Sequence, residues 1–228
     1  GITQENAQAI AEIGARLDGL PLAIELAAAW VKLLTPAALL ARLSGAQPLH
    51  MLASGARDLP ARQQTLRNTI AWSYDLLGPA EQRLFRALGV CVGGCSLEAA
   101  EALAADLPPA QVLGALAALV DGSLLRQEAG RVIMLETIRE YALELLAGAG
   151  ELPATAHRHA SVFLDLAATA RTHLLDEQQE HWLDRLEAEH DNLRAALAWC
   201  CAPGGDAALG MRLAEALWEF WLMRGHVG

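Results

Sequence analysis

The sequence holds a single lysine, Lys32, and only three phenylalanines and two tyrosines among 228 residues. It contains no glycine-rich phosphate loop of the form GxxxxGK[S/T], no GxSxG and no HExxH. These absences exclude a phosphate-binding loop, a serine-hydrolase elbow and a zinc-protease helix from this stretch. The sequence therefore predicts that the chain itself is not an enzyme and has no catalytic residues.

Long hydrophobic runs are also missing, and the longest are stretches such as VLGALAALV at Val112–Val120. A membrane-spanning helix needs roughly 18 or more apolar residues. The N-terminal GITQENAQAI is polar and lacks the basic segment that opens a signal peptide. We therefore expect a cytoplasmic protein with no membrane partner.

A basic surface is absent from every part of the chain. The formal net charge is −10, and residues 149–228 carry six basic against twelve acidic side chains. Binding to nucleic-acid phosphates needs clustered positive charge, so a direct nucleic-acid partner is disfavoured. Paired carboxylates such as Glu187 and Glu189, or Asp176 and Glu177, are predicted to lie on solvated helix faces.

Metal-binding and disulfide patterns are lacking too. Cys91 and Cys95 have no second Cys or His pair at ligand spacing, and Cys200 and Cys201 are adjacent. Reduced thiols in a core fit this pattern better than a zinc site or a loop-closing disulfide. The seven histidines are scattered. They are predicted to be solvated surface side chains, so no metal site is expected.

What the sequence does have is helix-forming composition, with 46 alanines. Apolar periodicity and Gly, Pro and Ser boundary signals predict a mainly α fold. One hairpin is expected over Ser123–Glu136, with Gly130 in its turn, and Ser44–Gln63 reads as a connector. The predicted helices cover residues 3–17, 20–34, 36–43, 65–77, 80–91, 97–104, 110–122, 137–150, 157–174, 177–201 and 206–228.

The order of these elements predicts three parts. Residues 1–56 form a helical segment. Residues 57–148 have the helix, helix, helix, hairpin, helix order of a winged helix. Residues 149–228 read as the start of an α-solenoid, truncated from a longer protein. The third winged-helix helix, Ala110–Val120, has no Arg or Lys and is predicted to be buried rather than to read DNA bases.

Several segments together resemble the NB-ARC/STAND signalling ATPases of the bacterial LuxR/SARP-regulator branch. DGLPLAIELAAAW at Asp18–Trp30 resembles their GLPLA motif, and Arg62–Leu103 is similar to their winged helix. MLETIREYALELL sits where that family carries its MHD motif. LEAEHDNLRAALAWC and ALWEFWLMRGHVG are similar to the opening of its TPR-like sensor. These segments span nearly the whole chain in the family's order.

The resemblance implies a nucleotide switch. ADP or ATP, with Mg²⁺, would bind an upstream P-loop domain of the full-length parent, and this segment alone would hold no nucleotide strongly. In the family the motif proline packs near adenine, a role that falls on Pro21. Leu135 stands where the family has a phosphate-sensing histidine, and leucine cannot donate to a phosphate. The nucleotide-binding residues implied are Gly19, Leu20, Pro21, Leu22, Met134, Leu135 and Glu136.

The implied function is a regulatory segment that clamps this nucleotide and relays sensor signals to an output such as transcription regulation. Implied partners are the parent's own P-loop domain, an inducer protein or small molecule at the C-terminal helices, and further copies when active. The residues alone leave alternatives open. Gly19 and Pro21 also suit the end of one helix and the start of the next. Met134 also suits a strand end, and Glu136 a helix N-terminus. The alternative function is a helical protein-interaction scaffold with no nucleotide role.

Overall fold

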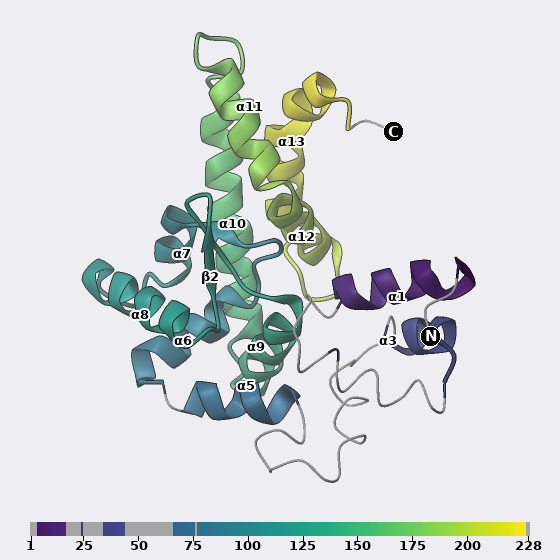
Figure 1. Ribbon diagram of the computed structural model, residues 1–228. Coiled ribbons are helices and arrows are strands. Elements are labelled where there is room, and N and C mark those ends of the chain that lie inside the picture. Colours follow the sequence, from purple (N-terminus) through teal and green to yellow (C-terminus); the bar gives the residue numbers. More distant parts are fainter. Residues whose placement is uncertain (1–3, 17–23, 25–33, 44–65, 76, 227–228) are drawn as a thin grey trace.

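The computed structural model describes residues 4–16, 24, 34–43, 66–75 and 77–226. Within them the chain is mainly helical with one small sheet (Figure 1), which confirms the predicted fold class. No described helix is both long enough and apolar enough to span a bilayer. The predicted turn at Gly19–Leu22 and the connector at Ser44–Gln63 lie outside the described residues.

The N-terminal helices are α1 (Gln4–Arg16) and α3 (Pro36–Leu43), which contact each other. The start of α3 follows the predicted capping pattern. Pro36 occupies its first position, and the backbone N–H of Ala38 donates to Thr35 Oγ1 at 3.3 Å. Leu39 of α3 is buried, at 1% exposed.

The elements of the predicted winged helix come next, and among the described residues four helices, rather than three, precede the hairpin. Ser96 Oγ accepts from the backbone N–H of Ala99 at 3.2 Å and caps the helix that starts at Leu97, as predicted. In the hairpin turn Ala129 and Gly130 have φ of +49° and +79°, the combination of a two-residue hairpin. The elements are α5 (Leu66–Asp75), α6 (Pro79–Leu88), α7 (Leu97–Leu103), α8 (Pro109–Asp121), β2 (Arg126–Glu128), β3 (Arg131–Ile133) and α9 (Glu136–Gly148).

The sheet has one strand more than the sequence predicted. Strand β1 (Cys95–Ser96) pairs antiparallel with β3, so the order is β1-β3-β2 and Ser96 lies opposite Arg131. Two residues are too few to show the alternating pattern of a strand, so this strand could not be predicted from the sequence. This pairing brings the loop before α7 onto the hairpin.

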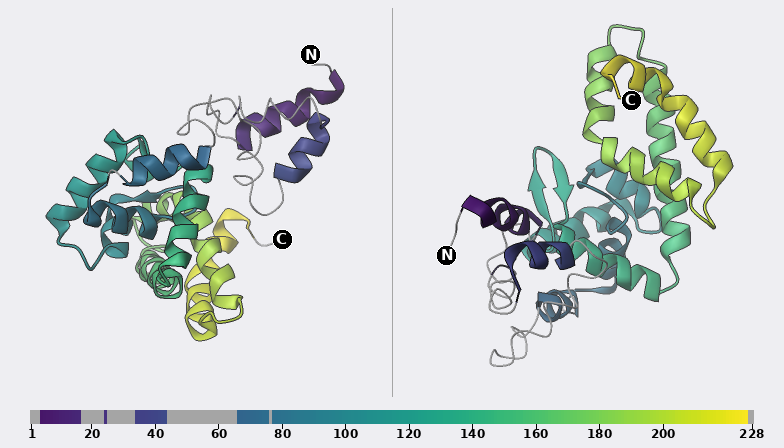
Figure 2. Two further views of the ribbon diagram at one scale, coloured as in Figure 1. Left: turned by 90° about the horizontal axis from the view of Figure 1, so that it is seen from below. Right: turned by 90° about the vertical axis from the view of Figure 1, so that its right-hand side faces the viewer.

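The C-terminal helices are α10 (Leu152–Arg171), α11 (Gln179–Ala188), α12 (His190–Cys201) and α13 (Ala207–Arg224). Helix α10 contacts α12 and α13, and it also contacts α7 of the winged helix. Figure 2 shows these helices packed beside the winged helix. The single helix predicted over residues 177–201 is wrong, because the chain breaks at Glu189, where φ is −103° and ψ is 9°.

Helix α8 is buried on one face only. Val112, Leu116 and Leu119 pack inward, whereas Leu113 is 50% exposed. The prediction that this helix is buried is therefore wrong for its outer face. An uncharged helix face is not always a packed one, because exposed apolar side chains are common on protein surfaces.

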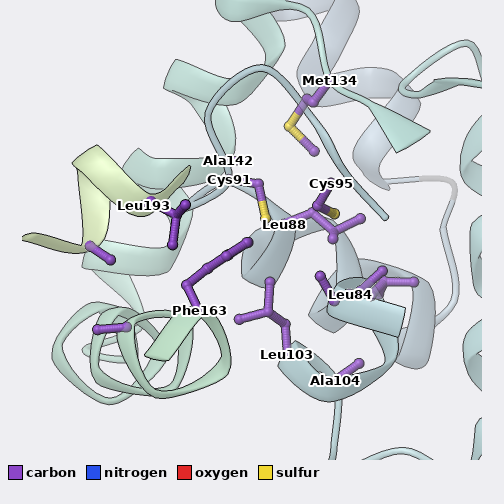
Figure 3. Close-up of a cluster of buried hydrophobic side chains, with 14 of the residues drawn as sticks. Leu84, Leu88, Cys91, Cys95, Leu103, Ala104, Met134, Ala142, Phe163 and Leu193 are labelled. Atoms are coloured by element: carbon purple, nitrogen blue, oxygen red, sulfur yellow. The ribbon is translucent and has the colours of Figure 1, made fainter. Parts of the chain in front are cut away.

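One hydrophobic cluster runs from the winged helix into the C-terminal helices. Figure 3 shows Leu88 and Leu103 of the winged helix beside Phe163 of α10, all buried. Cys91, Cys95 and Cys200 are buried as predicted, but Cys201 is exposed. The hydrogen bond with Cys95 raises the pKa of Cys91, and burial raises it further, so this thiol stays protonated.

Candidate functional site

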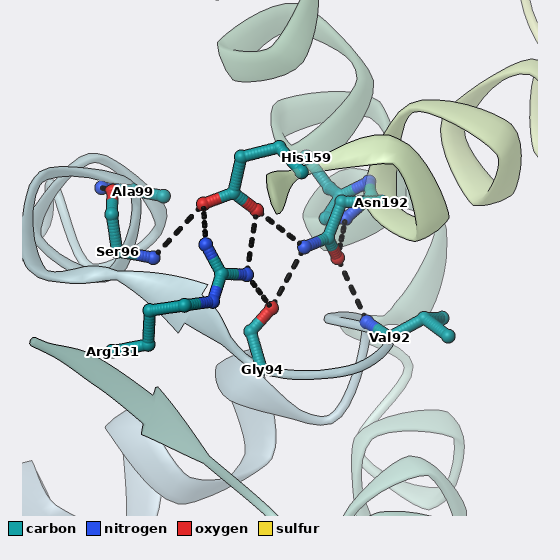
Figure 4. Close-up of polar contacts among 8 residues, drawn as sticks. Val92, Gly94, Ser96, Ala99, Arg131, His159 and Asn192 are labelled. Carbon is teal, nitrogen blue, oxygen red and sulfur yellow. Dashed lines mark hydrogen bonds and ion pairs between the residues drawn. The ribbon is translucent and has the colours of Figure 1, made fainter. Parts of the chain in front are cut away.

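A buried polar cluster joins the hairpin to the C-terminal helices, and we term it the hairpin–helix junction. It is formed by side chains of β3, α10 and α12, by the break between α11 and α12, and by the backbone of the loop before α7 (Figure 4). No pattern in the sequence pointed to this cluster. Its members are Val92, Gly94, Ser96, Arg131, His159, Glu189 and Asn192.

Arg131 of β3 forms a two-point ion pair with Glu189 at the α11–α12 break. Its Nη1 donates to Glu189 Oε1 at 2.6 Å, and its Nη2 donates to Oε2 at 3.0 Å. The two side chains are 20% and 4% exposed, respectively. Burial opposes the charge on Arg131, but the hydrogen bond and charge of Glu189 outweigh it and raise the pKa of Arg131. The charged pair therefore holds the hairpin against the C-terminal helices.

Asn192, buried in the first turn of α12, connects the same carboxylate to the loop. Its Nδ2 donates to Glu189 Oε2 and to the carbonyl oxygen of Gly94, both at 2.7 Å. Its Oδ1 accepts from the backbone N–H of Val92 at 2.8 Å. This amide therefore ties the loop before β1 directly to α12, with its polar atoms satisfied.

His159 of α10 is the last member of the cluster and contacts Asn192. Its Nε2 lies 3.3 Å from Asn192 Oδ1, its ring packs on Phe163, and it is only 3% exposed. Burial lowers its pKa to about 4, against the smaller opposing effect of the Asn192 hydrogen bond. His159 is therefore neutral near pH 7, and the prediction of solvated histidines is wrong for this residue.

The backbone at Gly94 makes the close approach possible. Its φ is +83°, and a Cβ at this position would lie 2.5 Å from the carbonyl oxygen of Val132. Only glycine fits such a position without displacing its neighbours. The Gly94 carbonyl can thus accept from both Asn192 and Arg131, the latter at 3.1 Å.

This arrangement is suited to holding elements together rather than to a reaction. The Glu189 carboxylate accepts two hydrogen bonds from Arg131, one from Asn192 and one from the Ser96 backbone N–H at 3.2 Å. Glu189 was predicted to lie on a solvated helix face, and this is wrong. Its partner arginine is 58 residues away in sequence, so no local pattern could have identified the pair.

The second candidate site is the predicted motif Met134–Glu136. Met134 and Leu135 are each 8% exposed and belong to the hydrophobic core. Glu136 opens α9 and forms a two-point ion pair with Arg139, at 2.8 and 2.7 Å. Those hydrogen bonds lower the pKa of Glu136. The motif therefore offers apolar side chains and an acidic side chain, but no side-chain hydrogen-bond donor for a phosphate.

The end of α1 lies close to this motif. After the larger effects of Arg139 and of burial, the charge of Arg16 also lowers the pKa of Glu136. Arg16 precedes the predicted site residues Gly19, Leu20, Pro21 and Leu22, all of which lie outside the described residues. Beside the motif, Glu140 Oε2 is buried with no hydrogen-bond partner among the described residues, and burial raises the pKa of Glu140.

No protein-family model matches the chain, and no solved structure matches it. The chain is 43% identical over 232 residues, or 99% of its length, to a Mycobacterium tuberculosis protein named "Putative HTH-type transcriptional regulator". It covers 26% of that protein. The chain thus spans about a quarter of the length of this curated relative.

Two further relatives match shorter parts. Regulatory protein AfsR of Streptomyces coelicolor is 33% identical over 154 residues, covering 62% of this chain and 16% of AfsR. Another M. tuberculosis protein, named only as uncharacterized, is 38% identical over 165 residues, covering 69% of this chain and 42% of the relative. Two of these three relatives carry regulator names.

Proposed function

We propose that this chain is the relay segment of a transcriptional regulator, in which the winged helix and the C-terminal helices transmit a signal as one body. The regulator names of two relatives support the class. The observation that carries the proposal is the hairpin–helix junction. Arg131, which a DNA-binding hairpin would present to phosphates, is instead paired with Glu189. The winged helix is therefore suited to follow the C-terminal helices rather than to contact DNA.

Within that role, the segment closes over ADP or ATP bound to a P-loop domain elsewhere in the parent protein. Two features support this finer proposal: the resemblance of Gly19–Leu22 and Met134–Glu136 to motifs of STAND ATPases, and the closeness of Arg16 to Glu136. A ligand that binds one arrangement of the segments more tightly would bias a two-state switch.

We place the proposed contact between this segment and the nucleotide at the adenine base and not at the phosphates. Leu135 is buried and cannot donate a hydrogen bond, and the Arg139 guanidinium is already used by Glu136 and by the Gly89 carbonyl at 3.2 Å. Phosphate sensing by this motif does not fit these side chains. Pro21 has the chemistry to pack on adenine, because its ring is flat, apolar and lacks an N–H.

The nucleotide content of the complete parent protein tests the clamp. The protein is purified and denatured with acid, and the released ADP and ATP are quantified by ion-exchange chromatography. We expect Pro21→Asp to reduce the bound nucleotide by about tenfold or more, equivalent to at least about 1.4 kcal/mol of binding free energy. Pro36→Asp is the control, since Pro36 is another proline of the N-terminal part and lies outside the motif, at the start of α3. Equal retention in wild type and Pro21→Asp would contradict the clamp.

A second candidate function is a helical protein-interaction scaffold with no nucleotide role. One observation favours it: Met211, Trp218 and Leu222 of α13 are 72%, 54% and 54% exposed and recur at helical spacing. Under this alternative the parent protein retains no nucleotide in wild type or in either variant, so the same experiment separates the two functions.

A further inference from the structure

Three side chains of metal-ligating type converge where α11, α12 and α13 meet. Glu187 lies in the last turn of α11, His190 begins α12, and His226 follows the C-terminal glycine of α13. One ligand atom of each lies within 4.8 Å of those of the other two. Glu187 and His226 are exposed and His190 is half-buried, so an ion in solution can reach them.

The backbone brings these side chains together. Glu187 and His190 stand on either side of the break at Glu189. Gly225 has a φ of +74°, which ends α13 and turns the chain back, so that the backbone N–H of His226 donates to the carbonyl oxygen of Trp221 at 3.0 Å. Arg224 pairs with Asp184 of α11 beside this turn. The backbone at the ends of α11, α12 and α13 therefore holds these three side chains close together.

The side-chain spacing is close to that of a metal site. His226 Nε2 lies 3.0 Å from Glu187 Oε2. The rings of His190 and His226 have centroids 4.3 Å apart, and both contact Phe220, at 5.9 and 5.5 Å. A tetrahedral Zn²⁺ holds nitrogen and oxygen ligands at about 2.0–2.2 Å, which places such ligand atoms only slightly farther apart than His226 and Glu187 are here.

Other histidine–carboxylate pairs on the described surface lack this third ligand. His173 Nδ1 lies 2.8 Å from an Asp176 oxygen, and His157 Nε2 lies 3.6 Å from an Asp206 oxygen. Across the described part of the chain, the Glu187 group is the one set of three such ligands within reach of one another. A single histidine–carboxylate pair is accounted for by its hydrogen bond. Two imidazoles and a carboxylate together also form a ligand set for a transition metal.

We propose that Glu187, His190 and His226 bind one Zn²⁺ ion, with water in the fourth position, and that the ion ties the end of α13 to the α11–α12 break. Zn²⁺ accepts two imidazoles and a carboxylate in tetrahedral geometry, whereas Mg²⁺ prefers oxygen ligands. Binding rotates the two rings out of their near-parallel arrangement so that their lone pairs meet at one point. This site is independent of the proposed nucleotide role.

Zinc titration of the tag-free protein against a chromophoric chelator tests the site. We expect one Zn²⁺ per chain, unaffected by excess Mg²⁺. His190→Ala and His226→Ala should each weaken the Zn²⁺ affinity by about a hundredfold or more. Removal of a residue that only hydrogen-bonds to a metal ligand already costs about 10–100-fold, and loss of a ligand itself should cost at least as much. His173→Ala is the matched control, because it removes a histidine from a pair with no third ligand, and it should bind as wild type does.

Two further measurements keep the outcome decisive. Glu187→Gln preserves the size of an exposed side chain and leaves the fold intact, so its weaker Zn²⁺ binding cannot come from unfolding. Co²⁺ added in place of Zn²⁺ should give the strong visible absorption of a four-coordinate ion, and His226→Ala should abolish that absorption. Unchanged Zn²⁺ affinity in all three cluster variants, or an equal loss in His173→Ala, would overturn the proposal.

Discussion

Two arginine–carboxylate pairs, one from strand β3 and one from the helix that follows it, have the same two-point geometry and different surroundings. Arg131–Glu189 joins residues 58 apart, with side chains 20% and 4% exposed. Arg139–Glu136 joins neighbours in the first turn of α9, with side chains 18% and 47% exposed. The contribution of such a pair to the free energy of unfolding therefore depends on how deeply the carboxylate is buried and on which elements the pair connects. It does not depend on the contact geometry alone.

The same difference separates a fixed region from an adjustable one. The buried Glu189 carboxylate contacts Arg131 of β3, the Ser96 backbone N–H and Asn192 of α12, so the hairpin and α12 are held in one arrangement. At Arg139 the pair stabilises a helix start that is favourable in any case, because an acidic side chain suits a helix N-terminus. In a switch, movement is expected at the α9 side, near the end of α1, and rigidity at the junction.

Removal of the buried pair's arginine should have the largest effect. We expect Arg131→Met to lower the free energy of unfolding by about 3–5 kcal/mol, because it leaves Glu189 charged, buried and without its ion-pair partner. Urea unfolding followed by far-UV circular dichroism measures this loss. The double variant Arg131→Met/Glu189→Leu should recover most of the stability, since an apolar pair needs no charge compensation. If Arg131→Met lowers the free energy of unfolding by less than about 1 kcal/mol, the Arg131–Glu189 pair contributes no more than an exposed ion pair such as Arg139–Glu136.

Acid should weaken the junction through His159. Its folded pKa of about 4 lies below its ordinary value of 6.5, so between these values the unfolded chain binds a proton that the folded chain does not. The contribution is therefore fully present above pH 6.5 and is lost as the pH falls towards 4, by up to about 3 kcal/mol.

The measurement is the free energy of unfolding at several pH values between 7 and 4. His159→Gln should flatten the slope between pH 6.5 and 4. A wild-type slope that persists in His159→Gln would assign the pH dependence to other groups.

Local signals in the sequence predicted most of the helices and the hairpin. Ser96, Pro36 and Gly130 each act through their nearest neighbours, so their roles as cap, helix start and turn could be predicted. Strand β1 could not be, because two residues carry no periodicity and the strand exists only through its pairing with β3. The break at Glu189 was missed for a related reason: the leucine stripe of α11 and α12 continues across it.

The candidate sites show the same limit more sharply. Glu189 and His159 look like solvated polar residues in sequence, and only contacts with residues far along the chain bury them. The Glu187–His226 contact likewise spans 39 residues. The nucleotide role of Gly19, Leu20, Pro21 and Leu22 stays a prediction from resemblance, because these residues lie outside the described part of the chain.

Two neighbouring glycines provide a smaller and sharper test of the junction. We expect Gly94→Ala to cost about 2–3 kcal/mol, since it adds a backbone clash at 2.5 Å to a strained positive φ. Gly93→Ala shares the positive φ, of +70°, but its Cβ would lie 3.4 Å from the nearest heavy atom, of Asp191, so only about 1 kcal/mol is expected. Urea unfolding of both variants measures the difference. Equal costs would mean that the close approach to β3 adds nothing to the conformational strain.

The smallest effect is expected at the partly exposed pair. Arg139→Met should lower the free energy of unfolding by less than about 1 kcal/mol, because Glu136 regains water when its partner is removed. Salt separates the two pairs further, since at 1 M ionic strength charges are screened within about 3 Å. The cost of Arg139→Met should shrink towards zero there, whereas that of Arg131→Met should persist, because water and ions do not reach Glu189. If both costs fall in parallel with salt, burial does not distinguish the pairs, and the junction is no more rigid than the helix start beside it.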